Sequence, residues 1–192
     1  MILLASTSPQ RRLILDQLGI PFEAVAPDYV EHDPPGLDPV AMVRAHARGK
    51  AWSLAGAEGR AGRPVLGVDT AVALDGRSYG KPADRAGAQA MLRALAGRTH
   101  EVVSGLCLLG DGWEELHHAT TRVTFRPLSD PDLEWYLDTG EWEGRAGAYA
   151  IQGRGAAVVE RIDGDYLNVV GLPAALLVRM LAERLPGAYV LG

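Results

Sequence analysis

The chain has 192 residues, a length that suits one domain or at most two small ones and that can bury a substantial core. Hydrophobic residues make up 47% and charged residues 22%, which excludes a disordered or fibrous chain. The net charge of −5 argues against a surface that grips nucleic acid nonspecifically, although it leaves room for a local cationic pocket.

Cysteine and lysine usage adds two expectations. The single cysteine, Cys107, cannot form an intramolecular disulfide and has no zinc-ligand spacing around it, which suits a reducing cytoplasm. The apolar run at residues 1–5 is too short for a signal sequence, and no stretch approaches the roughly 20 apolar residues of a membrane span. We therefore expect a cytoplasmic protein. Only two of the nineteen basic residues are lysines, Lys50 and Lys81, so each is a candidate for a role that a guanidinium fills badly, with chance as the alternative.

Hydrophobic periodicity, helix caps and turn residues predict alternating strands and helices. In the first half of the chain we expect a strand at 2–5, a helix from Pro9 ending at Gly19, a strand at 22–26, a loop at 27–36 that holds Glu31, a helix at 39–54 capped by Asp38, and a strand at 64–68 followed by Asp69 and Thr70. In the second half we expect a helix from Asp84 to Ala96, a hairpin of 102–109 with 115–125, and a helix capped by Ser129. A glycine-rich loop at 144–155, a second hairpin of 156–162 with 166–170, and a helix at 173–185 complete the prediction. This mixture predicts one α/β domain over residues 1–192, with a mixed twisted sheet flanked by helices.

The first strand breaks at Ser6-Thr7-Ser8-Pro9 and enters a helix, which brings hydroxyls, free backbone N–H groups and a positive helix end to one point. Phosphate binds well at such a point. Arg11 and Arg12 follow in the first turn, where the helix dipole disfavours cations, so an anionic ligand would explain them. The alternative is an ordinary Ser8 cap with two solvated arginines, and this loop alone does not decide between them because it is no Walker sequence.

Two carboxylates extend the argument. Asp69 directly follows an apolar strand, which predicts a position at a strand's carboxyl end, where open α/β sheets build ligand crevices. With Glu31 it offers oxygen ligands for Mg²⁺, or a base for a water. The alternatives are that Asp69 caps a turn and that Glu31, taken alone, is a solvated loop acid. No Gly-x-Ser-x-Gly motif occurs, and the five histidines lack a metal-ligand spacing, so we read them as structural or surface residues.

Five motifs occur in order along nearly the whole chain, and together they resemble the Maf family of nucleoside triphosphate pyrophosphatases. The motifs are Leu4-Ala5-Ser6-Thr7-Ser8-Pro9-Gln10-Arg11-Arg12, Gly67-Val68-Asp69-Thr70, Gly80-Lys81-Pro82, Gly147-Ala148-Tyr149-Ala150-Ile151-Gln152-Gly153-Arg154-Gly155 and Gly164-Asp165-Tyr166-Leu167-Asn168-Val169-Val170-Gly171-Leu172-Pro173. Glu31 and Lys50 also stand at matching places.

The resemblance implies the mixed α/β fold shared with inosine triphosphatase-like enzymes and hydrolysis of a nucleoside triphosphate to monophosphate and pyrophosphate. It implies a divalent cation, Mg²⁺ or else Mn²⁺ or Co²⁺, held by Glu31 and Asp69, and it suggests a homodimer. The resemblance also implies that Asp69 is the proton acceptor in the reaction. The other residues that the resemblance places in the site are Glu31, Lys50 and Lys81 among the catalytic residues, and Ser8, Gln10, Arg11, Thr70 and Gln152 among those that bind substrate.

The resemblance also bears on the base. Thr70 and Gln152 are similar to the dTTP and UTP branch of the family, whereas the 7-methyl-GTP branch tends to carry glutamine and glutamate there. An amide can both donate and accept, as a pyrimidine's O and N3–H require. Gln10 departs from both branches, since the pyrimidine branch usually has arginine there and the other branch tryptophan. We therefore expect a housecleaning pyrophosphatase for dTTP and UTP, and for modified pyrimidine nucleotides. The alternatives are a 7-methyl-GTP or broad-range pyrophosphatase, and a non-catalytic nucleotide sensor linked to cell division.

Overall fold

The computed structural model describes residues 1–32, 36–57 and 60–187. Its helices are α1 (Pro9–Gln17), α2 (Pro39–Ser53), α3 (Arg85–Leu95), α4 (Asp130–Leu137), α5 (Tyr166–Val170) and α6 (Ala174–Arg184), with 3-10 turns η1 (Ala146–Ala148) and η2 (Arg154–Val158). Its strands are β1 (Ile2–Ala5), β2 (Phe22–Val25), β3 (Val65–Leu74), β4 (Arg77–Tyr79), β5 (Thr99–Gly110), β6 (Trp113–Phe125) and β7 (Val159–Asp163). Residues 33–35 of the predicted loop lie outside the described residues.

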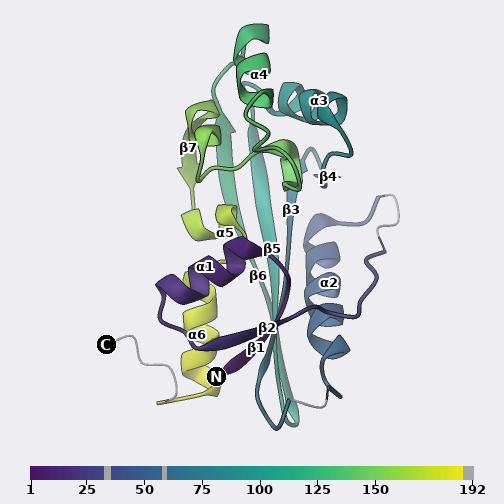
Figure 1. Cartoon of the computed structure of the whole chain (residues 1–192), viewed down its shortest axis with the longest axis vertical. Helices are drawn as coiled ribbons and strands as arrows, with labels where there is room; N and C mark the ends of the chain where they lie inside the picture. The colour runs from purple at the N-terminus through teal and green to yellow at the C-terminus, as the bar shows by residue number, and fades with distance from the viewer. Residues whose placement is uncertain (33–35, 58–59, 188–192) are drawn as a thin grey trace.

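The strands form one mixed sheet in the order β2-β1-β3-β5-β6-β7, with β4 paired to β3. β1 runs parallel to β2 and β3, while the β3, β5, β6 and β7 ladders are antiparallel. Figure 1 shows the long strands β3, β5 and β6 running along the length of the molecule. The predicted α/β class with a mixed sheet is confirmed.

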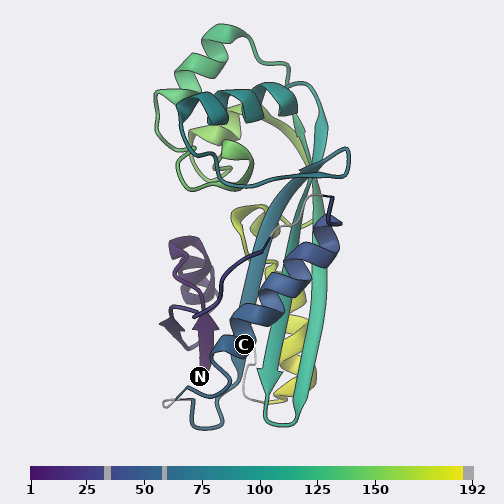
Figure 2. The same ribbon diagram turned by 90° about the vertical axis from the view of Figure 1, so that its right-hand side faces the viewer.

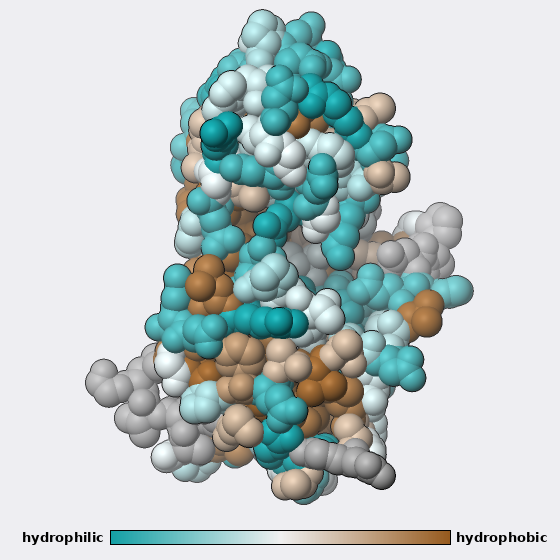
Figure 3. Space-filling model, in the orientation of Figure 1, coloured by the Kyte–Doolittle hydropathy of each residue, from teal (hydrophilic) through white to brown (hydrophobic). Residues whose placement is uncertain are grey.

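The lower half of the molecule in Figure 1 contains β1, β2, α1, α2 and α6. Helices cover both faces of the sheet there, and this is why its strands have continuous apolar runs in the sequence. Leu3 and Ala5 pack with Ala47 and Ala51 of α2 on one face. The alternate residues of β1 point the other way and pack with α1 and α6. At the other end of the long strands, α3 and α4 form a separate cluster with β3, β5 and β6. In Figure 3 hydrophilic side chains cover most of the upper half of one face, and hydrophobic ones gather lower down.

Local capping explains where the helices begin. Ser8, Asp38 and Asp84 each accept a backbone N–H three residues on, and Ser129 forms a reciprocal capping box with Asp132. These four starts were predicted from sequence and are confirmed.

One predicted element is wrong. The sequence predicts a strand at residues 166–170, but this segment is helix α5. The Asp165 side chain accepts the N–H groups of Leu167 and Asn168 and so begins a helix. The Asn168 amide donates to Val102 O at 2.9 Å and to Thr121 Oγ1 at 3.0 Å, which seats the helix on β5 and β6.

Candidate active site

A cleft of about 1110 Å³ separates the two halves of the molecule. Figure 2 shows the upper group of helices above β1 and α1, with the long strands running down the side of the molecule beside them. All nine residues that the sequence nominates line this one cleft: Ser8, Gln10, Arg11, Glu31, Lys50, Asp69, Thr70, Lys81 and Gln152. Elements from both ends of the chain therefore converge on it.

The sequence predicts that Asp69 lies at the end of its own strand, and this prediction is wrong. Asp69 lies within β3, which continues to Leu74. The neighbouring strand β1 ends at Ala5, whose register partner is Gly67. Asp69 thus stands two residues beyond the carboxyl end of β1, where β3 keeps β5 as a neighbour but has lost β1. The crevice belongs to the carboxyl end of β1, and β3 forms its floor.

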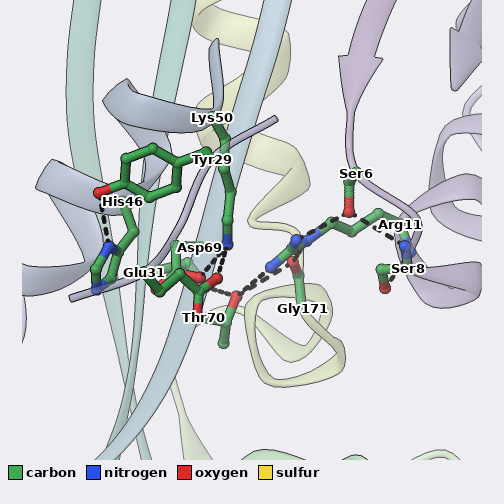
Figure 4. Close-up of polar contacts among 11 residues, drawn as sticks. Ser6, Ser8, Arg11, Tyr29, Glu31, His46, Lys50, Asp69, Thr70 and Gly171 are labelled. Carbon is green, nitrogen blue, oxygen red and sulfur yellow. Dashed lines mark hydrogen bonds and ion pairs between the residues drawn. The ribbon is translucent and has the colours of Figure 1, made fainter. Parts of the chain in front are cut away.

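Lys50 joins the two carboxylates. Its Nζ lies 2.6 Å from Asp69 Oδ1 and 2.6 Å from Glu31 Oε1 (Figure 4). Lys50 and Asp69 are buried, whereas Glu31 is about half exposed. Burial alone would raise the pKa of Glu31, but the hydrogen bond and the charge of Lys50 outweigh it, and the pKa lies below its ordinary value. Glu31 is therefore held as a carboxylate.

Arg11 lies on the opposite side of Asp69, and its guanidinium is tied to three parts of the chain (Figure 4). Nε donates to Gly171 O at 3.0 Å, Nη1 to Ser6 Oγ at 3.1 Å and Nη2 to Thr70 Oγ1 at 3.3 Å. Burial lowers the pKa of Arg11, and the charges of Asp69 and Glu31 oppose that shift. A guanidinium has five N–H groups, so two are left for an anion in the cleft. Arg12, by contrast, is exposed.

Thr70 lines the cleft, but its hydroxyl is taken up by the protein. Oγ1 donates to Gly171 O at 3.3 Å, and its two lone pairs are then occupied by Arg11 and by Ser104 Oγ, which lies 2.8 Å away. Thr70 therefore anchors Arg11.

Ser8 and Gln10 form the start of α1 at the cleft. The Ser8 hydroxyl caps the helix by accepting Arg11 N–H and donates to Gln10 Oε1 at 3.2 Å. Because Oε1 is used in this way, Nε2 is the part of the Gln10 amide that can donate to a ligand.

Lys81 and Gln152 reach the cleft from the other half of the molecule. Lys81 lies on the irregular segment after β4, and its charge contributes to the lowered pKa of Glu31. Gln152 lies between η1 and η2, in the predicted glycine-rich loop. Cations and polar groups thus line the cleft from both halves of the molecule.

Sequence reasoning missed Tyr29 and His46. His46 was read as structural or surface, yet it is buried and lines the cleft, with Nδ1 3.0 Å from the Tyr29 hydroxyl. The ring of Tyr29 occupies the space that a Cβ on Gly49 would need, so the chain leading to Glu31 is pressed onto α2. The signal was available: His46 precedes Lys50 by four residues, which places both on one face of a helix.

The site has the oxygen ligands that a hard divalent cation needs when it binds together with a phosphate. Glu31 and Asp69 supply carboxylate oxygens on the two sides of Lys50 Nζ, and Mg²⁺ is commonly held by one or two carboxylates plus substrate phosphates. Among residues 1–32, 36–57 and 60–187 no cluster of three or more His, Cys, Asp or Glu side chains is placed to hold a metal. A cation here would thus complete its shell with phosphate oxygens and water.

The chain is similar to known proteins over most of its length. A dTTP/UTP pyrophosphatase of Symbiobacterium thermophilum is 45% identical over 182 residues, covering 95% of this chain and 93% of that protein. A protein of the same name from Nitratidesulfovibrio vulgaris is 46% identical, covering 95% and 87%. The structure of the Staphylococcus aureus Ham1 protein matches with a TM-score of 0.46 and 17% identity over 65% of this chain and 71% of that one. In the described residues no helix is long and apolar enough to cross a membrane. The family model for Maf-like proteins matches residues 1–184, and the chain therefore belongs to the Maf family.

Proposed function

We propose that the protein hydrolyses dTTP and UTP to the monophosphate and pyrophosphate. The observation that carries the proposal is the group formed by Asp69, Glu31 and Lys50 on the floor of a cleft that also holds Arg11 and Lys81. A protein that only senses nucleotides needs phosphate contacts but no carboxylate poised beside them. The names of the relatives in Symbiobacterium and Nitratidesulfovibrio support the pyrimidine substrates.

In the proposed reaction Asp69 takes a proton from a water. The water oxygen forms a bond to the α-phosphorus, the bond from that phosphorus to the oxygen bridging to the β-phosphorus breaks, and pyrophosphate leaves with the electron pair. Lys50 donates to Oδ1 of Asp69 and so orients the carboxylate, whose Oδ2 is the atom that suits the water. Arg11 and Lys81 are placed to neutralise phosphate oxygens from the two sides of the cleft.

Glu31 and Asp69 are the residues that would hold a divalent cation, Mg²⁺ before Mn²⁺ or Co²⁺. When bound, it would supply charge neutralisation on the phosphate oxygens. Lys50, whose Nζ lies between the two carboxylates, contributes positive charge beside such a cation.

We assign the choice of base to Gln152, on the upper side of the cleft, and to Gln10, at the start of α1. Gln152 can donate to a pyrimidine carbonyl and accept from N3–H, as dTTP and UTP require. Gln10, through Nε2, adds a second donor from the opposite side. Thr70 contributes by fixing Arg11, since its hydroxyl is committed to Arg11, Ser104 and Gly171.

Asp69→Asn tests the proposal, because the amide keeps the shape of the side chain but cannot take the proton. Pyrophosphate release from UTP, dTTP, CTP, GTP and 7-methyl-GTP is measured with and without Mg²⁺. We expect the wild type to prefer UTP and dTTP, and kcat of Asp69→Asn to fall by at least about a hundredfold.

The matched control is Asp16→Asn, an exposed aspartate of α1 that does not line the cleft. It should retain wild-type kcat. Binding of UTP without pyrophosphate release by the wild type would favour a sensor, and a preference for 7-methyl-GTP would assign the protein to a different substrate.

A further inference from the structure

The segment that carries Gln152 is held in place by residues that do not line the cleft. Gly153 N–H donates to Ala150 O at 3.1 Å, which closes a turn with Ile151 and Gln152 at its centre. Ile151 is buried in the upper core, whereas Gln152 is exposed in the cleft. The direction of Gln152 therefore depends on how the two ends of this turn are fixed.

The N-terminal end is fixed by Tyr136 of α4. The backbone N–H of Ala150 donates to the Tyr136 hydroxyl at 3.0 Å. Tyr136 is buried, and this burial raises its pKa to about 12, so the group stays a neutral phenol. The hydroxyl thus provides a fixed acceptor at the start of the turn.

The C-terminal end is fixed by Glu141. Its Oε1 accepts Arg154 N–H at 3.0 Å, and its Oε2 accepts Gly155 N–H at 3.3 Å. The carboxylate oxygens lie 2.5 and 2.6 Å from the position that a Cβ on residue 153 would take, closer than a Cβ tolerates. Only glycine at 153 allows this approach. One carboxylate therefore holds two consecutive N–H groups just after Gln152.

Glu141 is itself held to the end of α4. Its own N–H donates to Thr139 Oγ1 at 3.0 Å, and Thr139 Oγ1 donates to Tyr136 O at 2.6 Å. The next residue, Trp142, donates its ring N–H to Leu137 O at 3.0 Å. The final carbonyls of α4 are thereby used to fix the chain that presents Glu141.

We propose that Glu141 and Tyr136 are positioning residues for base discrimination, which hold the turn so that Gln152 faces the base. The proposal rests on the proposed function, in which Gln152 reads a pyrimidine. Neither Glu141 nor Tyr136 is part of the cleft lining, so neither is a catalytic residue.

The test compares kcat and KM for UTP and GTP in the wild type, Glu141→Gln and Tyr136→Phe. An amide has one acceptor oxygen, so Glu141→Gln sets its NH₂ against one of the two N–H groups. We expect kcat/KM for UTP to fall about tenfold, mainly through KM, with little change for GTP. Tyr136→Phe keeps the buried ring, removes only the acceptor and should act in the same direction.

Hydrogen exchange gives a readout independent of activity: the amides of Ala150, Arg154 and Gly155 should exchange faster in Glu141→Gln. The matched control is Glu143→Gln, which removes the same charge from an exposed side chain two residues away. It should leave the UTP to GTP ratio and the exchange rates unchanged.

A double-mutant cycle with Gln152→Ala separates the two proposals. If Glu141 acts through Gln152, the double variant has the UTP to GTP ratio of Gln152→Ala alone. Additive effects, or an unchanged ratio in Glu141→Gln while Gln152→Ala alters it, would overturn the positioning role. An unchanged ratio in Gln152→Ala would instead remove Gln152 as the base reader, and the positioning role with it.

Discussion

At the scale of single residues, Lys50 shows why a lysine stands in a chain whose basic residues are mostly arginine. Its compact ammonium meets Asp69 and Glu31 at 2.6 Å each, from the last turn of α2. A guanidinium is planar and larger, and it binds carboxylates side-on through a fork. Both lysines line the cleft.

His100 is the buried histidine that makes stability depend on pH. It packs edge-on against Phe125 and Tyr149, and its Nε2 lies 2.9 Å from the Tyr149 hydroxyl, while Nδ1 has no partner among the described residues. Burial lowers its pKa to about 4 from 6.5. The unfolded chain therefore takes up a proton that the folded chain refuses, so stability falls as pH drops from about 6.5 towards 4.

We expect His100 to remove about 2 kcal/mol of unfolding free energy between pH 7 and pH 5. Urea unfolding of the wild type and of His100→Gln at both pH values checks this, because carboxylates contribute equally to both proteins. The wild type should lose about 2 kcal/mol more than the variant. Equal losses would show that His100 does not resist protonation.

At the scale of elements, two glycines set the position of α2. A Cβ on Gly67 of β3 would lie 2.0 Å from Ala47 O, and a Cβ on Gly105 of β5 would lie 2.3 Å from Val43 O. The helix backbone therefore rests directly on the sheet. This close approach brings Lys50 within reach of Asp69 on the same strand as Gly67.

Gly67→Ala should move α2 away from the sheet. Overpacking of this kind costs about 1–3 kcal/mol, and we expect a lower Tm together with a loss of kcat/KM at temperatures where the protein is fully folded. Gly56→Ala is the control, since a Cβ there meets nothing within 4 Å. Wild-type turnover in a destabilised Gly67→Ala would show that the spacing between α2 and β3 does not govern the site.

The elements also show how far sequence reasoning reaches. Ser8, Asp38 and Asp84 could be placed because a cap is a local interaction that the neighbouring residues specify. The segment at 166–170 could not, since its apolar residues after Asp163-Gly164 also suit a strand, and only the Asp165 cap marks the helix. The position of Asp69 depends on where β1 ends, a property of a different strand.

The same distinction applies to the candidate site. Its nine nominated residues come together, because the motifs that carry them follow strand ends, caps and tight turns. The contacts of His46 with Tyr29 and of Glu141 with Arg154 could not be predicted, because the partners lie 17 and 13 residues away in sequence. Such pairs follow from packing and not from spacing.

At the scale of the whole molecule, the cleft collects cations from both halves of a protein whose net charge is −5. Arg11 lies on α1 and Lys50 on α2, in the lower half, whereas Lys81 follows β4 in the upper half. A triphosphate can contact both sides at once, whereas a monophosphate is shorter. Ligand binding to the folded state should therefore stabilise the protein more for the triphosphate.

In the Asp69→Asn variant, which should bind UTP without hydrolysing it, we expect UTP to raise Tm by several degrees more than UMP does. Adding Lys81→Ala should reduce the difference between the two ligands. Adding Arg161→Ala, an exposed cation of β7, should not. Equal loss of stabilisation by UTP and UMP on Lys81→Ala would show that Lys81 does not read the outer phosphates.

The contact between Arg11 and Gly171 joins residues 160 positions apart, and this has a consequence for how the protein is made. A ribosome adds residues at about 5–20 per second, so the N-terminal segment emerges many seconds before its carbonyl acceptor exists. The β5–β6 hairpin, with its local pairing, can form in the meantime. The nascent chain thus carries an incomplete anion pocket until nearly its last helix is synthesised, and catalytic competence arrives late in translation.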